Sequence, residues 1–216
     1  MHIPDGILSN PINLAGFALA GIACLTSTHL SRCDQEDRHV PLLGMTAAFV
    51  FAAQMLNFPI AGGTSGHFLG AVFCATLLGP WMACLALTLV LGVQCLFFAD
   101  GGITALGTNI TNMAVIGVGV GFLVSRLMQA VLPASRTSAL IAVAVGSWSS
   151  VMAASAACAI ELGWSGKPLG VVLPALLGVH AIIGLGEAIL TTSALSLVLS
   201  VRPDLVPGIV SRKTAP

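Results

Sequence analysis

The first two residues of the chain, Met1 and His2, carry three nitrogens that can chelate one metal ion. The terminal amine and the main-chain nitrogen of His2 would close a five-membered ring, and that nitrogen and the His2 imidazole would close a six-membered ring. Binding through the main-chain nitrogen requires its deprotonation, which late divalent metals promote. A fourth position in the plane stays open, and square-planar nitrogen coordination indicates Ni(II) or Cu(II) rather than Zn(II) or Mg(II).

His67 is the best candidate for the fourth ligand. It follows Gly-Gly-Thr-Ser-Gly at 62–66, where the glycines allow a tight turn that presents the ring. Ligating imidazoles usually donate their other N–H to a carboxylate or a carbonyl, so we expect Asp100 to contact His67 or the N-terminus. The alternative role of Asp100 is a turn residue or a helix cap, because it lies in a glycine-rich stretch.

The N-terminal sequence Met-His-Ile-Pro-Asp-Gly lacks the cationic region with which a signal peptide begins. We therefore expect this segment to be retained. His2 is a bulky second residue, which disfavours removal of the initiator methionine. The mature chain is then expected to start at Met1 with a free amine.

The composition indicates a membrane protein. The chain has 216 residues, of which 56% are hydrophobic and 7% charged, with a mean hydropathy of +1.00. Soluble domains carry about 25% charged residues. Eight basic and eight acidic residues balance to a net charge of zero, which excludes an electrostatic nucleic-acid binder. The apolar runs are continuous rather than alternating, which favours helices over a β-barrel.

The apolar runs predict an all-α, polytopic membrane bundle of about seven transmembrane helices in a single domain, residues 1–216. The runs cover residues 11–30, 41–56, 68–78, 81–98, 103–124, 138–160 and 169–201. We divide the domain into an extracellular metal-chelating N-terminus (1–10), an extra N-terminal helix (11–31), a six-helix core (41–201) and a cytoplasmic tail (202–216).

The third run, 68–78, is too short to cross a bilayer alone. At 1.5 Å per residue it covers about 16 Å, against a hydrocarbon core of about 30 Å. We therefore expect the glycine-rich loop before it to dip into the membrane. Non-helical backbone is tolerated there only where protein or a water-filled cavity surrounds it.

The distribution of cations predicts the orientation, because Lys and Arg concentrate in cytoplasmic loops. With the N-terminus outside and the C-terminus inside, only Lys167 lies outside. The other seven cations then lie in the cytoplasm: Arg32, Arg38, Arg126, Arg136, Arg202, Arg212 and Lys213. The same topology brings residues 1–5, the 57–67 loop and Asp100 to the external side.

Four segments strongly resemble the CbiM/NikM family, the substrate-capture components of energy-coupling factor transporters for cobalt and nickel. They are MHIPDG at 1–6, MLNFPIAGGTSGHFLGA at 55–71, ADGGITALGTN at 99–109 and HAIIGLGEAI at 180–189. The resemblance implies an N-terminus that inserts into the bundle from outside. It also implies a metal held by the Met1 amine, the main-chain nitrogen and imidazole of His2, and the His67 imidazole. The loop around Asn57, Thr64 and Ser65 would hold the N-terminus in place.

The resemblance further implies partners and a location. Family members work with a transmembrane coupling subunit (EcfT/CbiQ-like) and ATPases (CbiO-like), often with a small auxiliary membrane subunit, in the bacterial cytoplasmic (inner) membrane. This chain lacks a G-x-x-x-x-G-K-[ST] phosphate loop, so ATP would be hydrolysed by the partners, and Ni²⁺ or Co²⁺ would be the transported substrate. The small residues Ala48 and Ala52 are candidate contacts with the coupling subunit, with packing inside the chain as the alternative.

The sequence offers two alternative functions. A rhomboid-like intramembrane serine protease would use Ser65 as nucleophile and His180 as base. However, Ile183 stands where rhomboids place a glycine, and the N-terminal motif would stay unexplained. A passive metal channel is disfavoured because a four-nitrogen chelate holds its ion too tightly for rapid conduction.

Glu187 lies deep inside the last apolar run, on the same helix face as His180. Ionisable groups at that depth are costly and tend to mark function. The alternative role is a structural polar bridge from Glu187 to Asn109, Thr111 or Asn112 on another helix.

Overall fold

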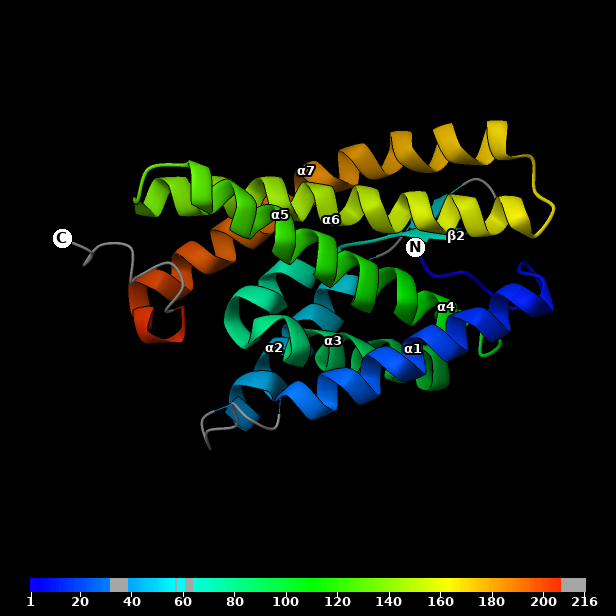
Figure 1. Cartoon of the computed structure of the whole chain (residues 1–216), viewed down its shortest axis with the longest axis horizontal. Coiled ribbons are helices and arrows are strands. Elements are labelled where there is room, and N and C mark those ends of the chain that lie inside the picture. Colours follow the sequence, from blue (N-terminus) through cyan, green and yellow to red (C-terminus); the bar gives the residue numbers. More distant parts are fainter. Residues whose placement is uncertain (32–38, 57, 61–63, 207–216) are drawn as a thin grey trace.

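The computed structural model describes residues 1–31, 39–56, 58–60 and 64–206. Its helices are α1 (Asn10–Ser31), α2 (His39–Gln54), α3 (Ala71–Phe98), α4 (Leu106–Ile110), η2 (Thr111–Gly117), α5 (Val118–Val131), α6 (Arg136–Trp164), α7 (Leu169–Val201) and η3 (Pro203–Leu205). The long helices lie roughly side by side in one bundle (Figure 1). A short antiparallel hairpin, β1 (Phe58–Ile60) with β2 (Thr64–Gly66), pairs Phe58 with Gly66 and was not expected from the sequence.

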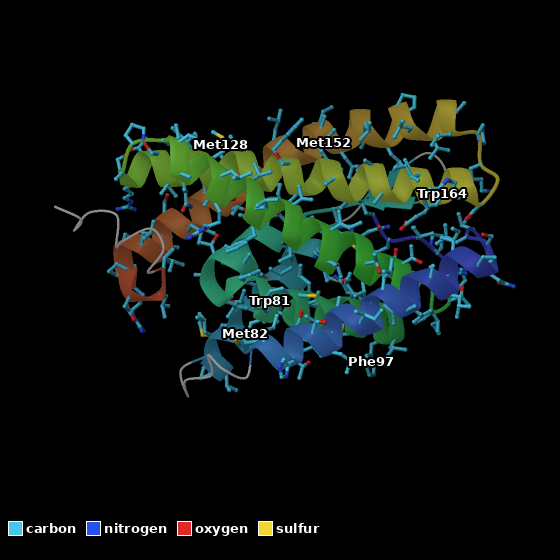
Figure 2. The ribbon with its side chains drawn as sticks, viewed as in Figure 1. Trp81, Met82, Phe97, Met128, Met152 and Trp164 are labelled. Atoms are coloured by element: carbon cyan, nitrogen blue, oxygen red, sulfur yellow. The ribbon has the colours of Figure 1, made fainter. Side chains whose placement is uncertain are left out.

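The prediction of a helical, multi-pass membrane protein is confirmed. Five described helical stretches are long and apolar enough to cross a membrane: Asn10–Ser31, Ala71–Phe98, Leu106–Val131, Arg136–Trp164 and Leu169–Val201. A shorter apolar helix, Val40–Gln54, accompanies them. Large apolar side chains point outward from these helices, among them Trp164 near the end where α1 begins (Figure 2).

The third and fourth apolar runs form one element, α3, that is broken in its interior. Gly79 has φ 77° and ψ 164°, a conformation that favours glycine, and Pro80 follows without an N–H to continue the helix. The residues that flank the two ends of α3, His67 and Asp100, both contact His2. The upstream limb (71–78) and the downstream limb (80–98) therefore fold back toward the same end of the bundle.

One continuous helix runs from α4 to α5 and contains a π-helical stretch, η2. Its first turns pack closely on α1. A side chain at Gly107 would collide with the backbone of Phe17, and one at Gly16 would collide with the backbone of Thr108. The hydroxyl of Thr111 donates to the carbonyl oxygen of Gly16 at 3.1 Å, which joins the two helices.

The first residues of the chain enter the bundle between the long helices, and Figure 1 shows the N-terminus beside β2. The side chains of Met1 and Ile3 are completely buried. Ile3 packs in an apolar cluster with residues of α6 and α7, including Cys158, Leu162 and Leu176. The N-terminal segment is thus part of the core rather than an exposed tail.

Candidate metal-binding site

The side chain of Asn109 on α4 holds the N-terminal segment through the main chain of Ile3. The Ile3 N–H donates to Oδ1 of Asn109 at 2.9 Å, and Nδ2 of Asn109 donates to the Ile3 carbonyl at 3.1 Å. The N–H of Gly102 donates to the same carbonyl at 2.9 Å. Both the N–H and the carbonyl of Ile3, the residue after His2, are therefore held by hydrogen bonds.

Asp5 fastens the segment at the edge of the bundle. Its carboxylate accepts from the N–H of Ile103 at 3.1 Å, from the N–H of Thr104 at 2.7 Å and from the Thr104 hydroxyl at 2.5 Å. The bond from the Thr104 hydroxyl is the main cause that lowers the pKa of Asp5. A side chain at Gly102 would collide with the Pro4 and Asp5 backbone, so the close approach depends on glycine there.

The rings of His2 and His67 stack inside the bundle, with centroids 4.4 Å apart and planes at 21°. Both side chains are buried, at 4% and 1% exposure. Nδ1 of His67 lies 2.6 Å from the Phe68 carbonyl oxygen, which can only accept, so Nδ1 donates. Nε2 of His67 then carries a lone pair, and it has no hydrogen-bond partner among the described residues.

Asp100 lies against the N-terminus, on the turn after α3. Its Oδ1 is 3.0 Å from Nδ1 of His2. We expected a carboxylate on the ring nitrogen that does not bind metal. The nitrogen contacted is instead the one that closes the six-membered chelate ring. Asp100 is thus placed to attract a cation that Nδ1 binds.

Burial keeps the nitrogen donors neutral. Desolvation is the main cause that lowers the pKa of the Met1 amine from 8.0 to about 5. Burial also lowers the pKa of His2, and the Asp100 carboxylate partly offsets it. The pKa of His67 is well below its usual value because of burial first, then the nearby N-terminus and His2. At pH 7 the Met1 amine is therefore neutral and has a lone pair, and each imidazole is neutral with a lone pair on one of its two ring nitrogens.

The predicted bridge from Glu187 to Asn109, Thr111 or Asn112 is wrong. Glu187 instead accepts from the N–H of Leu69 at 2.7 Å and from the N–H of Gly70 at 2.8 Å. The three candidate partners bind elsewhere, and Asn112 donates to Glu161 at 2.5 Å. Glu161 was not predicted from the sequence as a polar partner inside the bundle. Its position directly after the apolar run 138–160 is the signal that could have identified it.

His180 is fully buried in α7, and its Nδ1 donates to the Leu176 carbonyl of the same helix at 2.8 Å. The described part of the chain contains no group of three or more His, Cys, Asp and Glu side chains that could hold an ion. Asn57 and the side chains of Thr64 and Ser65, which we expected to hold the N-terminus, lie outside the described residues.

Comparisons with known proteins agree on one family. Residues 2–205 match the model of CbiM, described as the cobalt uptake substrate-specific transmembrane region. The NikMN protein of Archaeoglobus fulgidus, whose name describes a fused nickel transport protein, is 41% identical over 220 residues, which cover 100% of this chain and 70% of the relative. The cobalt transport protein CbiM of Sorangium cellulosum is 31% identical over 227 residues, covering 100% and 99%. The crystal structure of a truncated transition metal transporter superposes with a TM-score of 0.86 at 36% identity, covering 93% of this chain and 99% of that one.

Proposed function

The chain belongs to the CbiM family of cobalt uptake substrate-specific transmembrane proteins, and we propose that it is the membrane subunit that captures Ni(II) or Co(II) for uptake. It is a transport protein and not an enzyme, since its relatives are named for metal transport and its structural neighbour is a transporter. The serine protease alternative with Ser65 and His180 is therefore set aside.

The proposed ligands are the Met1 amine, the main-chain nitrogen and Nδ1 of His2, and Nε2 of His67. The observation that carries the proposal is the buried stack of His2 on His67 beside the N-terminus. In the chelate, the His67 ring would occupy the position next to the His2 ring. The two ring centroids lie 4.4 Å apart, so the two imidazoles are close enough to bind one ion.

Four nitrogens in a plane suit nickel, and the order of divalent affinities places nickel above cobalt. Asp100 and the backbone bonds of Asn109 would serve as the supports of the chelate, the first by its negative charge and the second by fixing the residue after His2. We extend the proposal to Asn57, Thr64 and Ser65 as further supports of the N-terminus.

The proposed topology has the N-terminus outside, the C-terminus inside and seven crossings, with the two limbs of α3 as separate crossings. It keeps the division into residues 1–10, 11–31, 41–201 and 202–216. Among the described cations, Lys167 lies by the start of α1, because Ser9 bonds the neighbouring Ser165, whereas Arg136 lies at the far end of α6. This asymmetry supports the orientation. The subunit would work in the bacterial inner membrane with an EcfT/CbiQ-like coupling subunit, CbiO-like ATPases and a small auxiliary subunit.

Calorimetric titration of the purified, full-length protein with nickel tests the site. One glycine added before Met1 displaces the amine from the five-membered ring, and His67→Ala removes the fourth nitrogen. Each change should weaken binding by more than about 100-fold, beyond what the loss of an outer-sphere partner costs. His29→Ala changes an exposed histidine of α1 and should leave the affinity unaltered. The site is wrong if His67→Ala binds nickel as tightly as the unaltered protein.

A further inference from the structure

Glu187 is a buried acid whose side chain is 2% exposed in the middle of α7. Its two carboxylate oxygens each accept one N–H, from Leu69 at 2.7 Å and from Gly70 at 2.8 Å. Gly70 is the N-cap residue directly before α3, and its φ of 76° places it in the left-handed region. Glu187 thus holds the non-helical backbone that joins β2 to α3.

The same short segment is held from a second helix. Nε2 of Gln54, at the end of α2, donates to the Leu69 carbonyl at 2.8 Å, and Gln54 is fully buried. Irregular backbone inside a membrane bundle requires such partners, because no bulk water is present to satisfy it. The amide and carbonyl of Leu69 are therefore both fixed by side chains from other helices.

Leu69, which Glu187 and Gln54 hold, lies two residues after His67. The His67 ring takes its orientation from the bond between Nδ1 and the Phe68 carbonyl, at 2.6 Å. The position of that carbonyl depends on the peptide of Leu69, whose N–H is bound to Glu187. A continuous chain of bonds thus runs from α7 through the backbone of residues 68–70 to the imidazole that stacks on His2.

We propose that Glu187 is a positioning residue for metal capture, which holds the segment 68–70 so that Nε2 of His67 faces the Met1–His2 chelate. The inference rests on the proposed function, and it assigns to Glu187 no contact with the metal. A carboxylate suits this role because it offers an acceptor oxygen to each of two adjacent N–H groups. A carboxamide offers one oxygen, and it turns an NH₂ group toward the second N–H.

The test compares Glu187→Gln with Glu161→Gln in the full-length protein. Glu161 is a matched control, since it is also an acid within the bundle, and its bond runs to Asn112 rather than to the His67 loop. Glu187→Gln should lower nickel affinity about 10- to 100-fold, the range for outer-sphere partners of a metal ligand. It should also speed hydrogen exchange at residues 68–70 of the metal-free protein. Glu161→Gln should change neither measurement.

Glu187→Asp is the second variant, for the case in which Glu187→Gln fails to fold, because it keeps a carboxyl group on a shorter side chain. Its affinity should lie between those of the unaltered protein and Glu187→Gln. Equal nickel affinity and equal exchange at 68–70 in all variants would overturn the positioning role and leave the proposed function standing. Failure of the unaltered protein to bind nickel would instead overturn the proposed function, and the role of Glu187 in capture with it.

Discussion

The imidazole of His2 stacks on that of His67 with a centroid separation of 4.4 Å, although 64 residues separate them in the chain. Square-planar Ni(II) is diamagnetic, so both rings should give sharp NMR signals in the nickel complex and both should shift on binding. The signal of the exposed His29 ring should stay in place. Broadened or unmoved signals from His67 would contradict a planar site that includes its ring.

The rate of metal release should depend on Asp5. This residue is not a proposed ligand, but it holds the N-terminal segment against residues 103 and 104. Its carboxylate accepts three hydrogen bonds from Ile103 and Thr104. Asp5→Ala removes these charge-assisted bonds and frees the N-terminal segment to leave the bundle more often. We expect nickel to dissociate about 5- to 10-fold faster, the effect of losing one typical hydrogen bond of about 1 kcal/mol.

The control for this experiment is Asp204→Ala. Asp204 also accepts hydrogen bonds at the surface, from Arg202 at 2.9 and 2.8 Å, but it lies at the C-terminal end of the described chain. Stopped-flow measurement with a competing chelator gives the rates. If Asp5→Ala leaves the dissociation rate unchanged, the hydrogen bonds of Asp5 do not limit the release of nickel.

Proton release on metal binding should report the neutral state of the Met1 amine. Burial lowers the pKa of this amine from 8.0 to about 5, so at pH 7 it has already lost its proton. Nickel binding at pH 7 should therefore release about one proton, from the main-chain nitrogen of His2, whereas an exposed N-terminus would release about two. Calorimetry in buffers of different ionisation enthalpy measures this number, and a value near two would contradict the buried amine.

The same pKa sets how docking of the N-terminus depends on pH. The undocked amine binds more protons than the docked one between pH 5 and 8, so docking strengthens as the pH rises through this window. The contribution is complete above about pH 8 and is lost as the pH falls through about 5. The low pKa values of His2 and His67 act in the same direction.

The residues of the proposed metal site could be named from the sequence because the chemistry of the proposed chelate is local. An amine, an amide and an imidazole in two consecutive residues can form a chelate by bond lengths alone, and the glycine-rich sequence at 62–66 comes directly before His67. The partners of Glu187 could not be found in this way. Main-chain N–H groups carry no signature in the sequence, so a search for polar side chains pointed to Asn109, Thr111 and Asn112 instead.

The break in α3 was visible in the sequence as Gly79–Pro80, and its geometry gives a final prediction. Gly79 has φ 77° and ψ 164°, and a side chain there would meet no described atom within 4 Å, so the expected cost of Gly79→Ala is conformational. We expect a loss of about 1–3 kcal/mol in unfolding free energy, because this combination of φ and ψ is essentially restricted to glycine. Gly92 is the matched control, since it also lies in α3 with open space around it but has no positive φ. Gly92→Ala should stabilise the protein by up to about 1 kcal/mol through helix propensity. Thermal unfolding in detergent should therefore move in opposite directions for the two variants, and a shift of the same sign in both would contradict the break at Gly79.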